Sequence, residues 1–259
     1  ARLPPSRMRH GPPLPAARSV VRANSQAHCP HTQGTKMPST TKRLAALMLF
    51  AALQANAQTP VPAGEIAGTA WTHTADSLAQ VVQQADVFLP ARATGAGDFF
   101  GKFRDAPATT GAKVAVVVFL HGSSGLGSAA IADFQRWLGS LGIASVAPNS
   151  FALPGRVTYK SPIDKPAYER IHALRLSEIE PAVQALAAQP WADRNRLILI
   201  GTSEGSVPVA RYTGGEFAAR VIYAWSCEPN YFVESPRSAF SDGKPVLNII
   251  SASDPFFSK

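Results

Sequence analysis

Ser203 is the residue best suited to act as a nucleophile, because it lies at the centre of the segment 201–205, which reads Gly-Thr-Ser-Glu-Gly. The apolar run 197–200 precedes this pattern, and a stretch compatible with a helix follows it. A serine on a tight turn from strand to helix is typical of a nucleophile elbow, where glycines let the neighbouring backbone pass without a Cβ clash. The amide of Glu204 would then face the developing oxyanion. The pattern predicts acyl-transfer chemistry at Ser203; a glycine-rich turn with a solvated serine is the alternative.

A second glycine-rich loop, 121–127, follows directly after the uninterrupted apolar run 114–120. Small residues allow its backbone to approach a substrate carbonyl, and Ser123 is the expected second oxyanion donor through its N–H. A phosphate-binding loop is the competing interpretation, but the sequence has neither the Lys-Ser/Thr pair nor the dinucleotide-type glycine spacing at this place. We expect the side chain of His121 to brace the loop rather than to transfer protons.

Asp254 is the predicted acid of the site. It follows the predicted strand 246–251, two strands beyond the nucleophile along the chain. A carboxylate at this place can orient an imidazole and stabilise its charged form. Glu228, just past the preceding predicted strand, is the alternative acid. A simple turn aspartate before Pro255 is the remaining interpretation.

The catalytic base is missing from this sequence, because no histidine follows Ser203. His73 precedes the predicted core and His172 lies within a predicted helix, so we expect neither to serve as the base. The six histidines of the chain are His10, His28, His31, His73, His121 and His172. In triads of this kind the histidine follows the acid, so we expect it beyond Lys259 in the complete protein. The 259-residue chain is therefore expected to be inactive.

The elements that must position these residues alternate between strands and helices. Strands are predicted over 86–90, 114–120, 143–147, 196–200, 221–226 and 246–251, and helices over 75–85, 129–141, 166–188 and 204–213. Pro181 is expected to kink or split the third helix, and Pro208 to shorten or bend the fourth. Residues 94–110 and 149–165 are predicted loops, the second long enough to overhang a site. Apolar strands alternating with helices predict a doubly wound, mostly parallel α/β sheet.

Four segments together carry a family resemblance. They are His-Gly-Ser-Ser-Gly-Leu at 121–126, Gln-Pro-Trp-Ala-Asp at 189–193, the 201–205 pattern and Ser-Ala-Ser-Asp-Pro at 251–255. Over residues 86–259 the chain resembles a dienelactone-hydrolase-type member of the α/β-hydrolase superfamily. The resemblance implies ester hydrolysis through a covalent acyl-enzyme, without a metal or an organic cofactor. The best-known dienelactone hydrolases have cysteine where this chain has Ser203, so their particular substrate is not carried over.

The net charge of +8 comes from the start of the chain. The first 57 residues hold eight basic and no acidic residues, whereas the rest holds 17 of each, so no nucleic-acid surface is expected on the body. Lys42 and Arg43, the apolar run 44–53 and Ala-x-Ala at 55–57 predict a secretory signal peptide over 37–57, cleaved after Ala57. About ten apolar residues are too few to cross a ~30 Å hydrocarbon core, so no stable membrane insertion is expected.

The remaining segment boundaries along the chain are predicted from the amino-acid composition. Residues 1–36 are rich in Pro, Arg and Ser and are expected to form a disordered extension upstream of a true start at Met37. Residues 58–85 are predicted to be a linker or N-terminal segment, and residues 86–259 an α/β-hydrolase domain that lacks its last strand and helix. Cys29 would be removed with the leader, which leaves Cys227 as a thiol that we expect to be a buried small hydrophobe.

These patterns predict an exported, secreted or periplasmic serine hydrolase of carboxylic esters whose partner is a small-molecule ester. A non-catalytic exported binding protein on the same scaffold is the alternative, and the missing histidine is its support. The side chain of Glu204 is expected either to shape the acyl pocket or to face solvent. The sequence does not define the ester, the oligomeric state or whether residues 149–165 form a lid.

Overall fold

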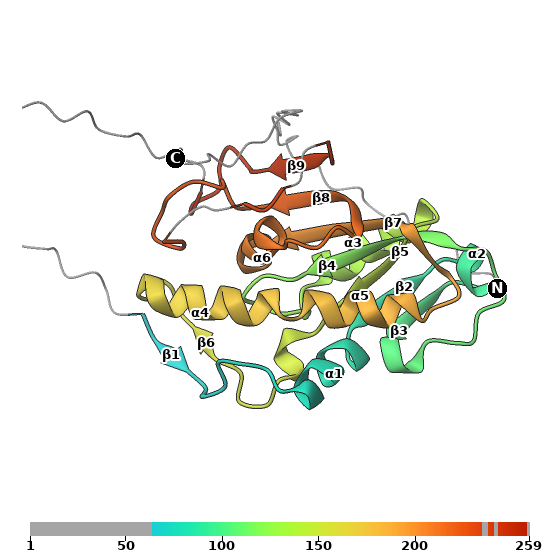
Figure 1. Ribbon diagram of the computed structural model, residues 1–259, viewed down its shortest axis with the longest axis horizontal. Coiled ribbons are helices and arrows are strands. Elements are labelled where there is room, and N and C mark those ends of the chain that lie inside the picture. The colour runs from blue at the N-terminus through green and yellow to red at the C-terminus, as the bar shows by residue number, and fades with distance from the viewer. Residues whose placement is uncertain (1–63, 235–237, 241–242, 258–259) are drawn as a thin grey trace, which may run out of the picture.

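A seven-stranded sheet forms the centre of the computed structural model, which describes residues 64–234, 238–240 and 243–257. The strand order is β3-β2-β5-β4-β7-β8-β9 (Figure 1). The strands are β2 (Asp86–Leu89), β3 (Phe99–Lys102), β4 (Val114–Leu120), β5 (Ala144–Ala147), β7 (Ala192–Thr202), β8 (Phe217–Tyr223) and β9 (Val246–Ile249). Strands β5, β4, β7, β8 and β9 run parallel, and β2 is antiparallel to β5 and β3.

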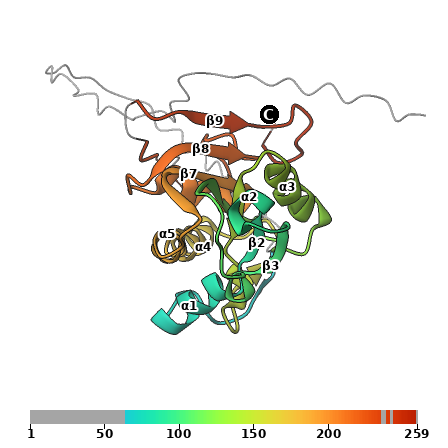
Figure 2. The ribbon, with the colours of Figure 1, turned by 90° about the vertical axis from the view of Figure 1, so that its right-hand side faces the viewer.

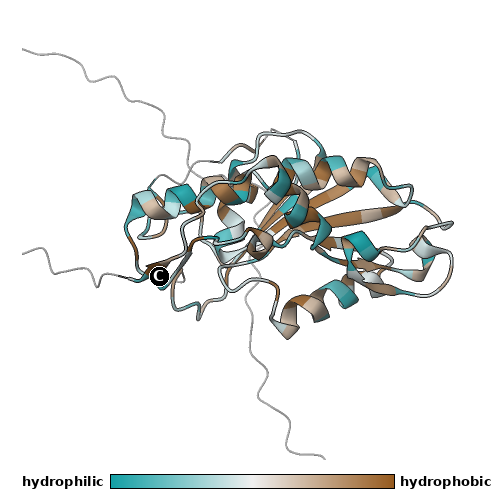
Figure 3. Ribbon diagram, turned by 90° about the horizontal axis from the view of Figure 1, so that it is seen from below, coloured by the Kyte–Doolittle hydropathy of each residue, from teal (hydrophilic) through white to brown (hydrophobic). Residues whose placement is uncertain are grey.

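Helices cover both faces of this sheet. They are α1 (Ala75–Gln83), α2 (Ala91–Thr94), α3 (Ala129–Ser140), α4 (Lys165–Leu176), α5 (Ile179–Ala187) and α6 (Ser206–Arg211). Figure 2 shows α3 on one side of the sheet and α4 and α5 on the other. The apolar strands lie between helices that carry hydrophilic residues (Figure 3). A separate two-stranded sheet pairs β1 (Ile66–Ala67) with β6 (Thr158–Tyr159).

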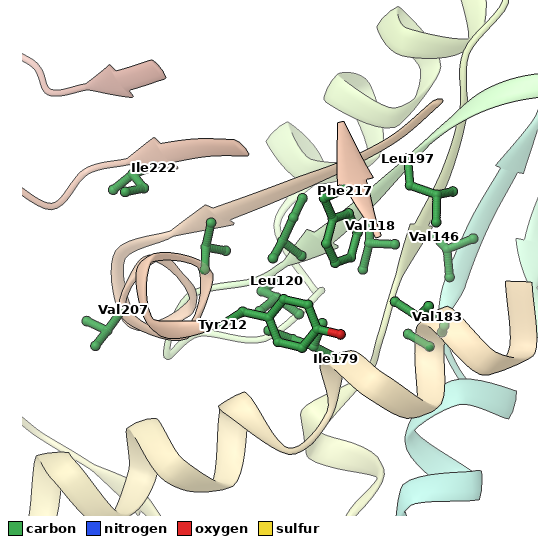
Figure 4. Close-up of a cluster of buried hydrophobic side chains, with 14 of the residues drawn as sticks. Val118, Leu120, Val146, Ile179, Val183, Leu197, Val207, Tyr212, Phe217 and Ile222 are labelled. Carbon is green, nitrogen blue, oxygen red and sulfur yellow. The ribbon is translucent and has the colours of Figure 1, made fainter. Parts of the chain in front are cut away.

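The alternation of side chains along β4 divides the core into two parts. Val116, Val118 and Leu120 join the larger cluster together with residues of α4, α5 and α6. Val117 and Phe119 join the smaller cluster, which α3 covers. Both sets are buried because a parallel strand with helices on both faces has no solvent-facing side. Figure 4 shows the larger cluster between the sheet and the helices.

The predicted fold class is confirmed: the sheet is doubly wound and mostly parallel. The predicted helix 166–188 is instead two helices, α4 and α5, which are separated at Ser177 and Glu178. Pro181 lies in the first turn of α5, where a missing N–H costs no intrahelical hydrogen bond. The prediction that the helix is split was therefore correct, but the split lies a few residues before Pro181.

Three further boundaries differ from the predictions. The segment 94–110, predicted as a loop, contains β3, which pairs with β2 at the edge of the sheet. The helix after the elbow is shorter than predicted. A 3₁₀ turn occupies Ser203–Gly205, and α6 follows it and ends at Arg211, before the extended Tyr212. Pro208 lies inside it, in agreement with the expected shortening. Strand β7 begins at Ala192, four residues earlier than predicted.

The N-terminal segment contributes to the fold from residue 64 onward. Helix α1 begins with a capping box in which Thr74 and Ser77 exchange hydrogen bonds, and its Val82 lies in the larger core cluster. Part of the predicted linker 58–85 thus packs against the domain. The predicted extension 1–36 and signal peptide 37–57 lie outside the described residues. Among the residues that are described, none of the helices is long and apolar enough to span a membrane.

Candidate active site

The turn after β7 has the geometry of a nucleophile elbow. Ser203 has φ 52°, a left-handed conformation that is strained for a residue with a Cβ. The flanking glycines allow the turn to be this tight: a Cβ on Gly201 would lie 2.1 Å from the carbonyl oxygen of Gly205. A Cβ on Gly205 would lie 2.3 Å from the carbonyl oxygen of Leu120 at the end of β4. Only glycine fits at both places, and Ser203 itself stays partly exposed.

The loop 121–127 lies beside this turn, as the sequence predicts. A Cβ on Gly122 would lie 3.4 Å from Cβ of Ser203, so the two segments are in contact. Strands β4 and β7 are parallel neighbours, and Leu120 is paired with Gly201, which brings their carboxyl ends to the same place. Ser123 is the next residue of the loop and is exposed. The structure therefore brings the predicted nucleophile and the predicted oxyanion segment together.

His121 braces the loop, as predicted. Its buried ring bonds to the carbonyl oxygen of Gly122 through Nδ1 at 2.7 Å, and Nε2 accepts the backbone N–H of Ser150 at 3.1 Å. These partners assign the proton to Nδ1, since Nε2 must act as an acceptor. Burial, followed by the positive charge of Arg175, lowers the pKa of His121 to about 3. The ring is therefore neutral at physiological pH and joins two loops.

The side chain of Glu204 does not face solvent, which corrects one of the two predictions for it. It is fully buried, and its Oε1 accepts Nη2 of Arg156 at 2.7 Å and Nη1 of Arg175 at 2.9 Å. The two arginines come from different elements, since Arg156 lies in the loop after β5 and Arg175 near the end of α4. Paired charges in this arrangement offset part of the cost of their burial.

These contacts close into a ring of five side chains, which we call the buried charged ring. Arg175 donates from Nε to Oε2 of Glu178 at 2.9 Å, and Glu178 accepts the hydroxyl of Ser150 through Oε1 at 2.5 Å. The Ser150 hydroxyl in turn accepts Nε of Arg156 at 2.7 Å. The members are Ser150, Arg156, Arg175, Glu178 and Glu204, and each is at most 5% exposed.

The surroundings of Glu178 in the ring favour its charged form. Burial alone would raise the pKa of Glu178, but Arg175 and three hydrogen-bonded or charged neighbours outweigh it and lower the pKa to about 2. Glu178 therefore stays ionised, and the two carboxylate side chains of the ring face two guanidinium groups. His73 extends it toward the N-terminal segment, with Nε2 at 3.1 Å from Oε1 of Glu178.

The loop 149–165 is joined to the elbow at two places. Arg156 bonds Glu204 and stacks over the ring of Phe151 at 4.4 Å. The hydroxyl of Tyr159 faces the side chains of Glu204 and Ser123; burial and then the Glu204 carboxylate raise the pKa of the phenol. Because these contacts are made by buried groups, the central part of the loop lies against the elbow.

Asp254 lies at the same edge of the sheet as Ser203, with β8 between their strands. It is partly buried, and Oδ1 accepts the backbone N–H groups of Phe256 at 2.8 Å and Phe257 at 2.9 Å. Figure 1 shows β8 and β9 ending on the side where α6 follows β7. Glu228, the alternative acid, is exposed after β8. The position of Asp254 agrees with an acid at this edge, while its role in a triad stays a prediction.

The other histidine of the described core has a packing role, as expected. His172 is 1% exposed and lies between the rings of Tyr168 and Phe232, with centroid distances of 6.3 and 4.7 Å. Burial, followed by the charge of Arg211, lowers its pKa to about 3. Cys227 is also buried, in the larger core cluster, as predicted. Among the described residues there is no group of His, Cys, Asp and Glu side chains that could hold a metal ion.

Arg156, Arg175 and Glu178 were not predicted from the sequence. A signal was present for two of them, because Arg175 and Glu178 are three residues apart at the end of a predicted amphipathic helix and beside its apolar positions. For Arg156 there was none, since an arginine in a polar loop is ordinarily solvated.

No known protein family and no curated protein matches the chain. Among solved structures it is similar to Est1E from Butyrivibrio proteoclasticus, at 14% identity and a TM-score of 0.36, covering 54% of this chain and 45% of that one. A candidate dienelactone hydrolase from Klebsiella pneumoniae subsp. pneumoniae gives 18% identity and a TM-score of 0.43, with 58% and 66% covered. Esterase B from Lactobacillus rhamnosis is 15% identical, with a TM-score of 0.36. The match covers 64% of this chain and 49% of that one.

The chain thus spans between 45% and 66% of the length of these three structures. By name they are esterases and hydrolases. The parallel sheet, the elbow after its central strand and the glycine-rich loop after the neighbouring strand define a fold of the α/β-hydrolase type.

Proposed function

We propose that this chain is the nucleophile-bearing part of an exported serine hydrolase that cleaves carboxylic esters. The observation that carries the proposal is the conformation of Ser203. A serine held at φ 52° between two glycines that admit no Cβ, in contact with the loop 121–127, has a strained backbone that the surrounding structure maintains. Such strain is expected where a side chain must be presented to a substrate.

In the proposed reaction Ser203 attacks the acyl carbon and forms an acyl-enzyme, which water then hydrolyses. The N–H groups of Ser123 and Glu204 stabilise the negative charge that develops on the carbonyl oxygen. Asp254 orients a histidine that lies beyond Lys259 in the complete protein, and that histidine accepts the proton of Ser203. Export follows from the proposed signal peptide 37–57, with cleavage after Ala57.

Fluorophosphonate labelling of the complete gene product, read out by intact mass, tests the proposal. The wild-type protein is expected to gain one adduct, and the Ser203→Ala variant none. The 259-residue chain is expected to stay unlabelled, because it has no histidine after Asp254. A folded complete protein without an adduct would instead favour a non-catalytic binding protein on this scaffold. Strong labelling of the 259-residue chain would contradict the proposed place of the base.

A further inference from the structure

Arg175 contacts both segments that carry the proposed oxyanion donors. Its Nη1 donates to Oε1 of Glu204 at 2.9 Å and to the carbonyl oxygen of His121 at 3.0 Å. Glu204 carries one proposed donor on its own amide, and His121 lies two residues before the other, Ser123. A single guanidinium nitrogen therefore connects the elbow to the start of the loop 121–127.

Arg175 is also held through its Nε. Its Nε donates to Glu178, and its side chain is fully buried. A guanidinium is planar and presents its N–H groups in a rigid fork, so a bond at Nε determines where Nη1 points. Since His121 is also held by Ser150, the loop cannot follow a displaced Arg175 without breaking another buried bond.

We infer that Arg175 is a positioning residue that sets the distance between the N–H groups of Ser123 and Glu204. This inference rests on the proposed function, because it assigns Arg175 to the oxyanion hole of that reaction. Oxyanion stabilisation depends on donors that are already in place when charge develops. Arg175 itself contacts no reacting atom; it acts through Glu204 and His121.

The test compares Arg175→Lys with Arg220→Lys in the complete gene product. Lysine keeps the buried positive charge but cannot reach Glu178, Glu204 and His121 from one planar group. Arg220 is the matched control: it is also buried and bonds the carbonyl oxygens of Val209, Tyr212 and Gly214, away from both oxyanion segments. Both variants are measured well below their unfolding midpoints.

Arg175→Lys is expected to slow fluorophosphonate labelling about 10- to 100-fold, somewhat less than the loss of a whole oxyanion donor. With p-nitrophenyl acetate, kcat should fall while KM changes less than about threefold, because ground-state binding does not use the oxyanion hole. Amide hydrogen exchange should rise in 121–125 and 203–206. Arg220→Lys should leave the labelling rate and the exchange of both segments unchanged. Equal labelling of Arg175→Lys and wild type would overturn the inference.

Two further experiments test the inference if the wild-type protein is not labelled or if Arg175→Lys does not fold. If the wild-type protein is folded but takes no label, the proposed function fails, and the exchange measurement still decides whether Arg175 holds the two segments. If Arg175→Lys does not fold, Glu178→Gln and Glu178→Ala replace it. Glutamine keeps an acceptor for Nε of Arg175 and should retain most of the labelling rate, whereas alanine removes the acceptor that orients Arg175 and should slow labelling; equal rates would contradict the inference.

Discussion

Glu204, which follows Ser203, is fixed by a ring of charged groups, whereas Asp254 lies in a turn whose neighbour Phe257 packs among aromatic rings. Three of the five connections within the buried charged ring are directed hydrogen bonds between residues 28 to 48 positions apart in the chain. Oδ1 of Asp254 accepts the N–H groups of residues two and three positions further along its own turn.

Near Asp254 lies an aromatic cluster, which consists of Tyr168, His172, Tyr231, Phe232 and Phe257. Phe232 is its centre, with centroids 4.8 Å from Tyr168, 4.7 Å from His172 and 5.9 Å from Phe257. Apolar contacts have little directionality, so a cluster of this kind can adjust to small changes. The buried charged ring cannot adjust in this way, because removing one member leaves a buried charge without its partner. Glu204 is therefore held by directed charged contacts, whereas the surroundings of Asp254 include packed aromatic rings.

Arg175→Met should give the largest loss of stability. It leaves Glu178 and Glu204 buried without their shared partner, and breaking a buried pair in this way costs about 3–5 kcal/mol of unfolding free energy. Arg136→Met is the matched control, since Arg136 pairs with Asp133 on the exposed side of α3 and should cost less than about 0.5 kcal/mol. Urea denaturation of both variants measures the difference. Equal losses would show that the ring contributes no more than a surface pair.

Acid should destabilise both regions through their histidines. The pKa values of His121 and His172 are about 3 in the folded protein, against 6.5 ordinarily. Below pH 6.5 the unfolded chain binds protons that the folded chain does not, so the free energy of unfolding falls as the pH falls toward 3. By pH 5 the loss is about 2 kcal/mol for each histidine.

His172→Phe separates the contributions of the two regions to this pH dependence. Phenylalanine does not titrate and suits the aromatic surroundings, so urea denaturation at pH 7 and pH 5 should show about 2 kcal/mol less pH dependence than in the wild type. An unchanged pH dependence would mean that His172 is protonated in the folded state.

Phe232→Leu tests whether the aromatic cluster adjusts as apolar packing should. The substitution keeps an apolar side chain of similar size and should cost about 1 kcal/mol, near the range for such exchanges. Phe232→Ala, which leaves a cavity, should cost about 3–5 kcal/mol. Thermal or urea unfolding distinguishes them. A leucine variant as unstable as the alanine variant would mean that the ring geometry, rather than filled volume, holds this side.

Asp254→Asn should have the smallest effect on stability. The asparagine side chain keeps an oxygen that can accept the N–H groups of Phe256 and Phe257, so the unfolding free energy should change by less than about 0.5 kcal/mol. In the complete gene product the same change should slow labelling by about 10³- to 10⁴-fold, because the amide cannot stabilise a charged imidazole. Normal labelling of this variant would exclude Asp254 as the acid.

The sequence by itself determined the order of strands and helices, the elbow and the place of the glycine-rich loop. These follow from local chemistry: an uninterrupted apolar run such as 114–120 forms a strand with both faces covered, and only glycine permits the close approach at positions 201 and 205. Short elements were harder to predict from the sequence. Strand β3 lies at the edge of the sheet and mixes apolar and polar residues, unlike the continuous apolar run of a central strand. The end of α4 depends on the pairing of Arg175 with Glu178 inside the fold.

The tertiary structure alone decided what surrounds the nucleophile. Glu204 follows Ser203 in the chain, yet its partners Arg156 and Arg175 lie 48 and 29 residues away, so no local pattern could show that its carboxylate is buried and paired. A charged side chain is expected to be exposed to solvent unless it pairs with groups of opposite charge in the protein interior. Whether such groups lie near it depends on how loops and helices pack over the sheet. The residue types of the site follow from the sequence, and the contacts that position them follow from the fold.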